Sequence, residues 1–185
     1  GLSSNCGGLI YTYAGNVNIS NATISDCYSN NMGGAFYFYG YSSTWNTTVN
    51  ITNTTFDNCS AKGTDNGYGG LFAVSNNANV TLDGCTISKC SSKTYGGAIA
   101  MLTATSILNI QNGTAISNCS ASTYGGAIHC ANGTATLKGS SISGCSASTG
   151  GSFYITGGTI NVNENSVITG TNAYMTTAGT LNIDN

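Results

Sequence analysis

The chain has 185 residues, of which 26 are glycine, eight are cysteine and none is proline or arginine. Its four lysines and six acidic residues leave a formal net charge of −2, so no basic surface is present to neutralise the phosphates of a nucleic acid. No apolar run approaches the ~20 residues of a membrane-spanning helix, and asparagine, serine and threonine supply most of the polarity.

The first predicted element is a glycine doublet followed by a small or aliphatic residue and then a bulky one. It begins as "GGLI" at 7–10 and recurs as "GGAF", "GGLF", "GGAI", "GGAI" and "GGSF". The second glycines of successive doublets are 26, 36, 27, 29 and 25 residues apart. Because a corner with positive φ or a close backbone approach excludes a Cβ atom, we predict structural turns at Gly8, Gly34, Gly70, Gly97, Gly126 and Gly151.

Two strand-like segments follow each doublet. The first has an apolar centre, as in "VNIS" at 17–20 and later in "VNIT", "VTLD", "LNIQ", "ATLK" and "INVN". The second ends in cysteine, as in "ISDC", "FDNC", "ISKC", "ISNC" and "ISGC". A last copy without a glycine doublet covers Thr171–Ile183. Short segments with a period of two, joined by glycine, asparagine and serine turns, indicate one solenoid coil per repeat.

We therefore predict an all-β, single-stranded parallel β-helix over residues 1–185, one domain of about seven coils of 21–36 residues with open, uncapped ends. Alternation along the strands assigns three interior columns. The first holds Ile10, Phe36, Phe72, Ile99, Ile128 and Phe153. The second holds Ile19, Ile51, Leu82, Ile110, Leu137, Val162 and Ile183. The third holds Ile24, Phe56, Ile87, Ile116, Ile142 and Val167.

The two alternating motifs, Gly-Gly-Ala followed by Ile or Phe and tetrapeptides of the Phe-x-x-Asn type, resemble the repeats of polymorphic outer membrane proteins and of their relatives on protist surfaces. Here cysteine stands where that family often has asparagine. The resemblance covers nearly the whole chain, because both motifs recur in order about six times. It implies a right-handed β-helical surface passenger, often adhesive; membrane anchoring does not carry over.

Six cysteines are predicted to share one position and form a cysteine ladder: Cys6, Cys27, Cys59, Cys90, Cys119 and Cys145. Equivalent Cα atoms on neighbouring coils lie about 4.8 Å apart, within the window that a disulfide tolerates, so buried thiols and disulfides both stay open. A single file lacks the tetrahedral pairing of a zinc site. Cys85 stands apart, and Cys130 falls on an interior column with Phe38, Val74, Met101 and Ile155.

No catalytic residue, metal site or cofactor is assigned. His129, the only histidine, shares an outward column with Tyr11, Tyr37 and Tyr154, where we expect a solvated side chain. Adjacent strand residues point to opposite faces, which excludes a Cys130–His129 nucleophile. Asp26 and Asp57 are expected at the same column of neighbouring coils and are the one carboxylate pair that suits a carbohydrate-active enzyme.

Two further features bear on binding. Tyr68, Tyr95 and Tyr124 precede three successive doublets and are expected to form an exposed stack suited to sugars or a partner. Ice binding is a third alternative, although the threonine column Thr23, Thr55 and Thr86 gives way to Ala115 and Ser141.

Asparagine-x-Ser/Thr glycosylation sequences, and eight cysteines in a chain rich in asparagine and threonine and poor in charge, favour a secreted, extracellular protein carrying N-linked glycans. The candidate acceptors are Asn18, Asn21, Asn46, Asn50, Asn53, Asn58, Asn79, Asn112, Asn118 and Asn132.

The two ends of the chain, Gly1 and Asn185, complete one another in register when joined. Eight steps separate Ile183 from Cys6 across the junction, as they separate Ile19 from Cys27. We therefore expect head-to-tail self-assembly, as tandem repeats or stacked subunits, into a filament. The leading hypothesis is a non-enzymatic surface filament or adhesive scaffold, with surface carbohydrates among its candidate partners.

Overall fold

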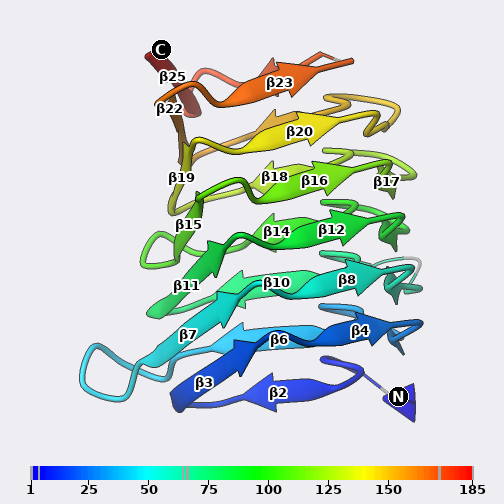
Figure 1. Ribbon diagram of the computed structural model, residues 1–185, viewed down its shortest axis with the longest axis vertical. Helices are drawn as coiled ribbons and strands as arrows, with labels where there is room; N and C mark the ends of the chain where they lie inside the picture. Colours follow the sequence, from blue (N-terminus) through cyan, green and yellow to red (C-terminus); the bar gives the residue numbers. More distant parts are fainter. Residues whose placement is uncertain (1, 4, 64, 66, 171, 185) are drawn as a thin grey trace.

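The computed structural model describes residues 2–3, 5–63, 65, 67–170 and 172–184, and within these ranges it contains strands and turns but no helix. The chain winds into a stack of coils that climbs from the N-terminus to the C-terminus (Figure 1). Every strand pairing is parallel and joins one coil to the next. The predicted all-β parallel solenoid is confirmed.

Each coil contributes short strands to four parallel sheets, here called sheets I to IV. Sheet I contains β2 (Ile10–Thr12), β6 (Phe36–Tyr39), β10 (Phe72–Ser75), β14 (Ile99–Met101), β18 (Ile128–Cys130), β21 (Phe153–Ile155) and β24 (Tyr174–Met175). Sheet II contains β3 (Gly15–Ser20), β7 (Thr47–Thr52), β11 (Ala78–Asp83), β15 (Ile107–Gln111), β19 (Thr134–Lys138), β22 (Thr159–Asn163) and β25 (Thr180–Asp184). Seven strands in each, among the described residues, match the expected seven coils.

The other two sheets are shorter. Sheet III contains β4 (Thr23–Ser25), β8 (Thr55–Asp57), β12 (Thr86–Ser88), β16 (Ala115–Ser117), β20 (Ser141–Ser143) and β23 (Val167–Thr169). Sheet IV contains β1 (Leu2–Ser3), β5 (Tyr28–Ser29), β9 (Ser60–Ala61), β13 (Ser91–Ser92) and β17 (Ser120–Ala121). The strands of sheet IV have only two residues each, so fewer backbone hydrogen bonds join neighbouring coils there than in the other three sheets.

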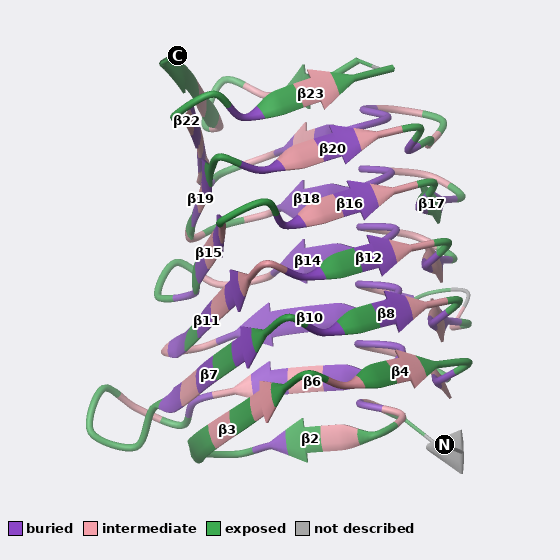
Figure 2. Ribbon diagram, viewed as in Figure 1, coloured by how far each residue is buried: buried purple, intermediate pink, exposed green. Residues whose placement is uncertain are grey.

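The interior is one narrow apolar core that runs the length of the stack, and Figure 2 shows the buried residues concentrated in its middle coils. The strand register confirms the first and second predicted columns, although Ile183, on the last coil of the second, is 64% exposed. The assignment of Val167 to the third column is wrong: Ile168 pairs with Ile142 in its place, and Val167 is 54% exposed. The corner before β23 holds one extra residue, with both Glu164 and Asn165 at positive φ, and this shifts the alternation by one.

The glycine doublets form corners for two different reasons. At Gly96-Gly97 the first glycine has a φ of 66°, a left-handed conformation that disfavours side chains. The second glycine lies against the next coil: a Cβ on Gly97 would overlap the Gly126 carbonyl oxygen and lie 2.5 Å from the backbone carbon of Ser120. The predicted turns are confirmed, with positive φ on the first glycine of each doublet and close approach on the second at Gly8, Gly34, Gly70, Gly97 and Gly126.

Two more corners per coil require left-handed residues, which the sequence did not reveal. The corner between sheets II and III places Asn21, Asn53, Gly84, Asn112 and Gly139 at positive φ. The corner between sheets III and IV does the same with Asp26, Asn58, Lys89, Asn118, Gly144 and Gly170. Asparagine and glycine tolerate this conformation best, so the fold accounts for part of their abundance.

A file of small polar residues lines the inner side of the corner between sheets II and III. The Thr114 hydroxyl accepts a hydrogen bond from the Cys85 amide at 3.1 Å and donates to the Gln111 carbonyl at 2.7 Å. Thr54, Ser140 and Ser166 hold the equivalent places on other coils. These side chains satisfy backbone groups that the turn leaves unpaired, and Cys85 is the one thiol in a file otherwise occupied by hydroxyls and Ala22.

The close approach at Gly97 predicts a large loss of stability for Gly97→Ala, at least about 4 kcal/mol, because a backbone carbonyl cannot move aside as a side chain does. Gly113→Ala is the matched control: its φ is 79°, but nothing lies within 4 Å of an added Cβ, so only the left-handed strain of about 1–2 kcal/mol applies. Urea unfolding of both variants measures the difference. Equal midpoints for the two would contradict the close-approach argument.

Candidate ligand-binding groove

A continuous stack of tyrosine rings runs along the outside of sheet I. Tyr68, Tyr95 and Tyr124 bridge in register just before their glycine doublets. The ring centroids of Tyr68 and Tyr95 lie 4.9 Å apart with the planes 4° from parallel, and those of Tyr95 and Tyr124 lie 5.0 Å apart. The predicted stack is confirmed, with each ring partly buried rather than fully exposed.

The stack continues onto the strands of sheet I, which the sequence did not predict. The Tyr124 ring lies 4.4 Å from that of Tyr154 on β21, and Tyr154 lies 5.3 Å from Tyr174 on β24. The corner file and the outward file of the sheet therefore join into one row of five rings. This row reaches across the outward face, because Tyr95 also contacts His129 on β18 with centroids 4.6 Å apart.

The outward file of sheet I changes from bulky to small and back along the stack. It reads Tyr11, Tyr37, Ala73, Ala100, His129, Tyr154 and Tyr174. Although Ala73 and Ala100 point outward, both are fully buried. Other side chains therefore cover the outward face of sheet I at these two coils.

His129 is not solvated, and that expectation is wrong. It holds the outward position, as predicted, but is only 4% exposed because the rings of Tyr95 and Tyr154 lie on it at 4.6 and 5.5 Å. Burial lowers the pKa of the imidazole to about 4, so it is neutral at physiological pH. Its Nδ1 atom is buried without a hydrogen-bond partner.

The groove has a volume of about 410 Å³ and follows the axis of the solenoid. One wall is formed by the tyrosines, and the other by residues just beyond the strands of sheet I. The lining residues are Met32, Tyr68, Tyr95, Leu102, His129, Ala131, Tyr154 and Thr156. None of them carries a charge at neutral pH, and phenol hydroxyls are combined with apolar surface. Such a surface is suited to a neutral ligand that has both hydroxyl groups and apolar faces.

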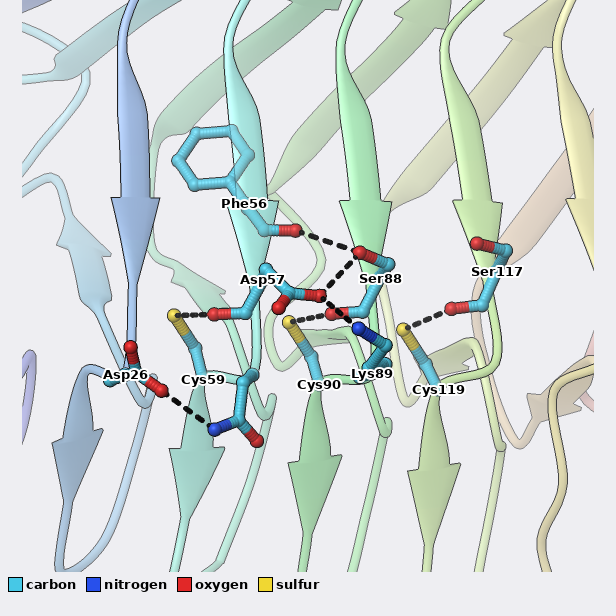
Figure 3. A network of polar contacts seen from close by, with 10 residues as sticks. Asp26, Phe56, Asp57, Cys59, Ser88, Lys89, Cys90, Ser117 and Cys119 are labelled. Carbon is cyan, nitrogen blue, oxygen red and sulfur yellow. Dashed lines mark hydrogen bonds and ion pairs between the residues drawn. The ribbon is translucent and has the colours of Figure 1, made fainter.

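The carboxylates expected to meet do not share a column. Asp57 pairs with Ser25, and Asp26 lies one position further along (Figure 3). The Asp26 carboxylate accepts a hydrogen bond from Asn58 at 2.7 Å, and this bond holds its pKa below the usual value. Asp57 accepts a hydrogen bond from Ser88 at 2.7 Å and lies 3.4 Å from the ammonium group of Lys89. Each acid has its own partner on the next coil, so the pair assigned to the enzyme alternative is not assembled.

Five of the six predicted ladder cysteines form one file, and Cys6 does not. Cys6 bridges Met32, which in turn bridges Tyr68, so it belongs to the tyrosine file. It precedes its glycine doublet directly, whereas Cys27 precedes its own by six residues. The eight-residue spacing from Ile183 to Cys6 is therefore not equivalent to the spacing from Ile19 to Cys27. Head-to-tail assembly stays a prediction, and its end residues Gly1 and Asn185 lie outside the described ranges. Cys130 lies in its predicted interior column and is fully buried.

All ten candidate glycosylation asparagines are exposed. Five of them have positive φ and therefore also serve as corner residues: Asn21, Asn53, Asn58, Asn112 and Asn118. The side chains of Asn50 and Asn58 donate hydrogen bonds to Asn18 and Asp26 on the preceding coil. Exposure makes all ten accessible in principle, while the corner geometry gives half of them a second reason to be asparagine.

The chain matches no protein-family model, no curated protein and no solved structure. Within the described ranges, no helix is long and apolar enough to cross a membrane, and no group of three or more His, Cys, Asp or Glu side chains is placed to hold a metal ion.

The buried imidazole predicts that stability falls as the pH is lowered. The unfolded chain binds a proton on His129 near pH 6.5, whereas the folded chain binds it only near pH 4. Stability is therefore fully present above pH 6.5 and is lost progressively down to about pH 4, by roughly 2 kcal/mol between pH 7.5 and 4.5. Urea unfolding at the two pH values measures this loss. The variant His129→Gln should lose much less unfolding free energy between these two pH values. An unchanged pH dependence of its stability would contradict the assignment to His129.

Proposed function

We propose that this protein is a non-enzymatic structural protein of the cell exterior, an adhesive β-helical scaffold whose tyrosine groove binds neutral carbohydrate. The observation that carries the proposal is the uncharged groove of about 410 Å³ between the tyrosine row and the far ends of the sheet I strands. A ligand lying in it contacts several coils at once, so the regular solenoid suits a repetitive chain better than a compact molecule.

The chemistry of the groove supports a sugar ligand. Stacked tyrosines expose their edges and phenol hydroxyls rather than open ring faces, because each face is covered by the next ring at 4.4–5.3 Å. Phenol hydroxyls donate and accept hydrogen bonds to sugar hydroxyls, while Leu102, Ala131 and Met32 offer apolar surface to carbon-bound hydrogens. The lack of a lysine or arginine in the lining disfavours acidic polysaccharides.

The extracellular setting is supported by the exposed glycosylation sequences and by the resemblance of the repeats to those of surface proteins. The rest of the surface is rich in asparagine, serine and threonine and poor in charge. N-linked glycans and a filament built from further coils belong to the same proposal.

Replacing Tyr95 tests the groove. We expect Tyr95→Ala to weaken binding of a neutral oligosaccharide at least tenfold, about 1.4 kcal/mol, because Tyr95 contacts Tyr68, Tyr124 and His129 and its loss opens the middle of the wall. The measurement is a glycan array with the labelled protein, followed by titration calorimetry on the best ligand.

Tyr11→Ala is the matched control, since Tyr11 is a 53% exposed tyrosine of the outward file of sheet I that does not line the groove. We expect it to bind within about twofold of the parent. Equal loss in both variants, or an array on which only acidic glycans bind, would overturn the proposal. Mass analysis of the bound glycan separates the alternative: cleavage that is lost in an Asp26/Asp57 double alanine variant would favour a carbohydrate-active enzyme.

A polar grid on sheet II favours a second candidate function, ice binding. Two outward files of this sheet are almost wholly asparagine and threonine. The first reads Asn18, Asn50, Thr81, Asn109, Thr136, Asn161 and Asn182. The second reads Asn16, Thr48, Asn79, Ile107, Thr134, Thr159 and Thr180. Hydroxyls and amides repeating about every 4.8 Å present water with a regular array, on a different sheet from the interrupted Thr23 column.

Ice-crystal shaping at micromolar protein tests this second candidate. We expect Thr136→Lys, which places a long charged side chain in the middle of the grid, to abolish shaping. Ser122→Lys, at an exposed position beside sheet IV, should leave it intact. Glycans on Asn18, Asn50 or Asn79 would cover the same face of sheet II. If the protein purified with its native glycans still shapes ice crystals, then either the grid is not the ice-binding surface or these three asparagines carry no glycan.

A further inference from the structure

Five cysteines on consecutive coils form an unbroken file at the corner between sheets III and IV. The residue that follows each cysteine donates its amide hydrogen to the carbonyl of the cysteine one coil earlier. These bonds are 2.9 Å from Ser60 to Cys27, from Ser91 to Cys59 and from Ser120 to Cys90, and 3.0 Å from Ser146 to Cys119. The ladder therefore places the five residues in strict register: Cys27, Cys59, Cys90, Cys119 and Cys145.

The five side chains also point the same way. Each thiol donates a weak hydrogen bond to the carbonyl two residues before it, at 3.3 to 3.6 Å. Figure 3 shows Cys59, Cys90 and Cys119 arranged side by side in this manner. All five are at most 5% exposed. The sulfur atoms consequently form one row inside the wall of the solenoid.

Neighbouring thiols in the row shift one another's pKa values. A hydrogen bond with Cys90 and burial raise the pKa of Cys59 well above its usual range, and a hydrogen bond with Cys145 raises that of Cys119 to about 12. At the far end the order reverses: the hydrogen bond from Cys119 lowers the pKa of Cys145. Cys145 is thus the member of the file in which the thiolate is most favoured.

We propose that this row is a redox modification site, in which a peroxide-class oxidant converts neighbouring thiols into coil-to-coil disulfides, at most two at a time. Equivalent Cα atoms on adjacent parallel strands lie about 4.8 Å apart, inside the ~4.4–6.8 Å range of disulfides, while second neighbours lie at twice that spacing, outside it. Only adjacent members can join. With five members, two disulfides leave one thiol, and it must be Cys27, Cys90 or Cys145.

The reaction balances with the peroxide as the only co-reactant. A cysteine thiolate attacks one oxygen of hydrogen peroxide, the O–O bond breaks, and the sulfur becomes a sulfenic acid while the other oxygen leaves as hydroxide and is protonated to water. The neighbouring thiol then attacks the sulfenic sulfur, forming the S–S bond and releasing a second water that takes up the thiol proton. Two thiols are oxidised and one peroxide is reduced. An adjacent thiol also protects each sulfenic acid from further oxidation.

The surroundings of the row admit a small oxidant. A surface hollow of about 360 Å³ lies over Ser60, Ser91 and Ser120, the residues that follow three of the cysteines. The strands of sheet IV that separate this hollow from the row have two residues each, so little ladder must open to expose a sulfur. Cys85 and Cys130 belong to other files without cysteine neighbours and should not participate.

The experiment oxidises the intact folded chain with hydrogen peroxide, alkylates the remaining thiols in denaturant, and identifies the links by peptide mapping. We expect the parent to lose four of its eight alkylatable thiols, with links only between adjacent members, and dithiothreitol to restore all eight. Circular dichroism before alkylation verifies that the chain is folded during oxidation.

Three variants sharpen the test. Cys90→Ser divides the row into two pairs, so only Cys27–Cys59 and Cys119–Cys145 links should form. Cys59→Ser isolates Cys27 and leaves three members, so one disulfide should form and Cys27 should always be alkylated. Cys85→Ser is the matched control, a buried cysteine in a file of threonines and serines, and it should keep both disulfides of the row.

Four results would overturn the proposal: no loss of thiols, sulfinic or sulfonic acid in place of disulfides, links between non-neighbours or to Cys85 or Cys130, or equal losses in Cys59→Ser and Cys90→Ser. If a variant does not fold, the link pattern of the parent alone decides between neighbours and non-neighbours.

Discussion

Backbone hydrogen bonding between successive coils is the constraint on which the rest of this structure depends. Every coil is held to the next by parallel ladders in one register, as in the amides that bond Ser60, Ser91 and Ser120 to the preceding cysteine carbonyls at 2.9 Å. Equivalent residues are thereby spaced about 4.8 Å apart, and each must suit the same local geometry. Most left-handed corner positions hold glycine, asparagine or aspartate, with Lys89 and Glu164 as exceptions, and the interior accepts only side chains that fill a narrow core.

The same constraint turns repeated residue types into rows with properties that a single copy lacks. One tyrosine on a corner is an ordinary surface residue, whereas five stacked rings from two adjacent files form a row. Tyr95 and Tyr154 of this row bury a histidine, and together with Tyr68 they line a groove. One buried cysteine acts as a small apolar side chain, whereas five in register are spaced as the proposed coil-to-coil disulfides require. The candidate sites of this protein are therefore consequences of stacking.

Charge has a minor part in holding the coils together. The ion pairs Lys89–Asp57 and Lys138–Glu164 lie on the surface, with N–O distances of 3.4 and 2.7 Å, and such pairs contribute less than about 1 kcal/mol each. Burial of the columns such as Phe36, Phe72 and Ile99, together with the ladders, is the main source of stability. The groove, like most of the surface, lacks charged side chains, so it offers no charged partner to an ionic ligand.

Periodicity in the sequence by itself determined the parallel solenoid, the glycine corners, the register of two apolar columns and the stack of Tyr68, Tyr95 and Tyr124, because a two-residue alternation and a recurring doublet leave one consistent way to stack. Only the tertiary structure decided the positions where a corner gains or loses a residue. One extra residue moved Ile168 into the column expected for Val167, and the short segment before its doublet removed Cys6 from the cysteine file. The one-residue offset between Asp26 and Asp57 could, by contrast, be read from the sequence, because Asp26 directly precedes Cys27 whereas Asp57 lies two residues before Cys59. The burial of His129 was beyond the sequence, since it depends on the ring of Tyr95 from a neighbouring corner and on that of Tyr154 from the next coil. Local alternation specifies which way a side chain points, but what covers it is set by residues about 30 positions distant, which only stacking brings together.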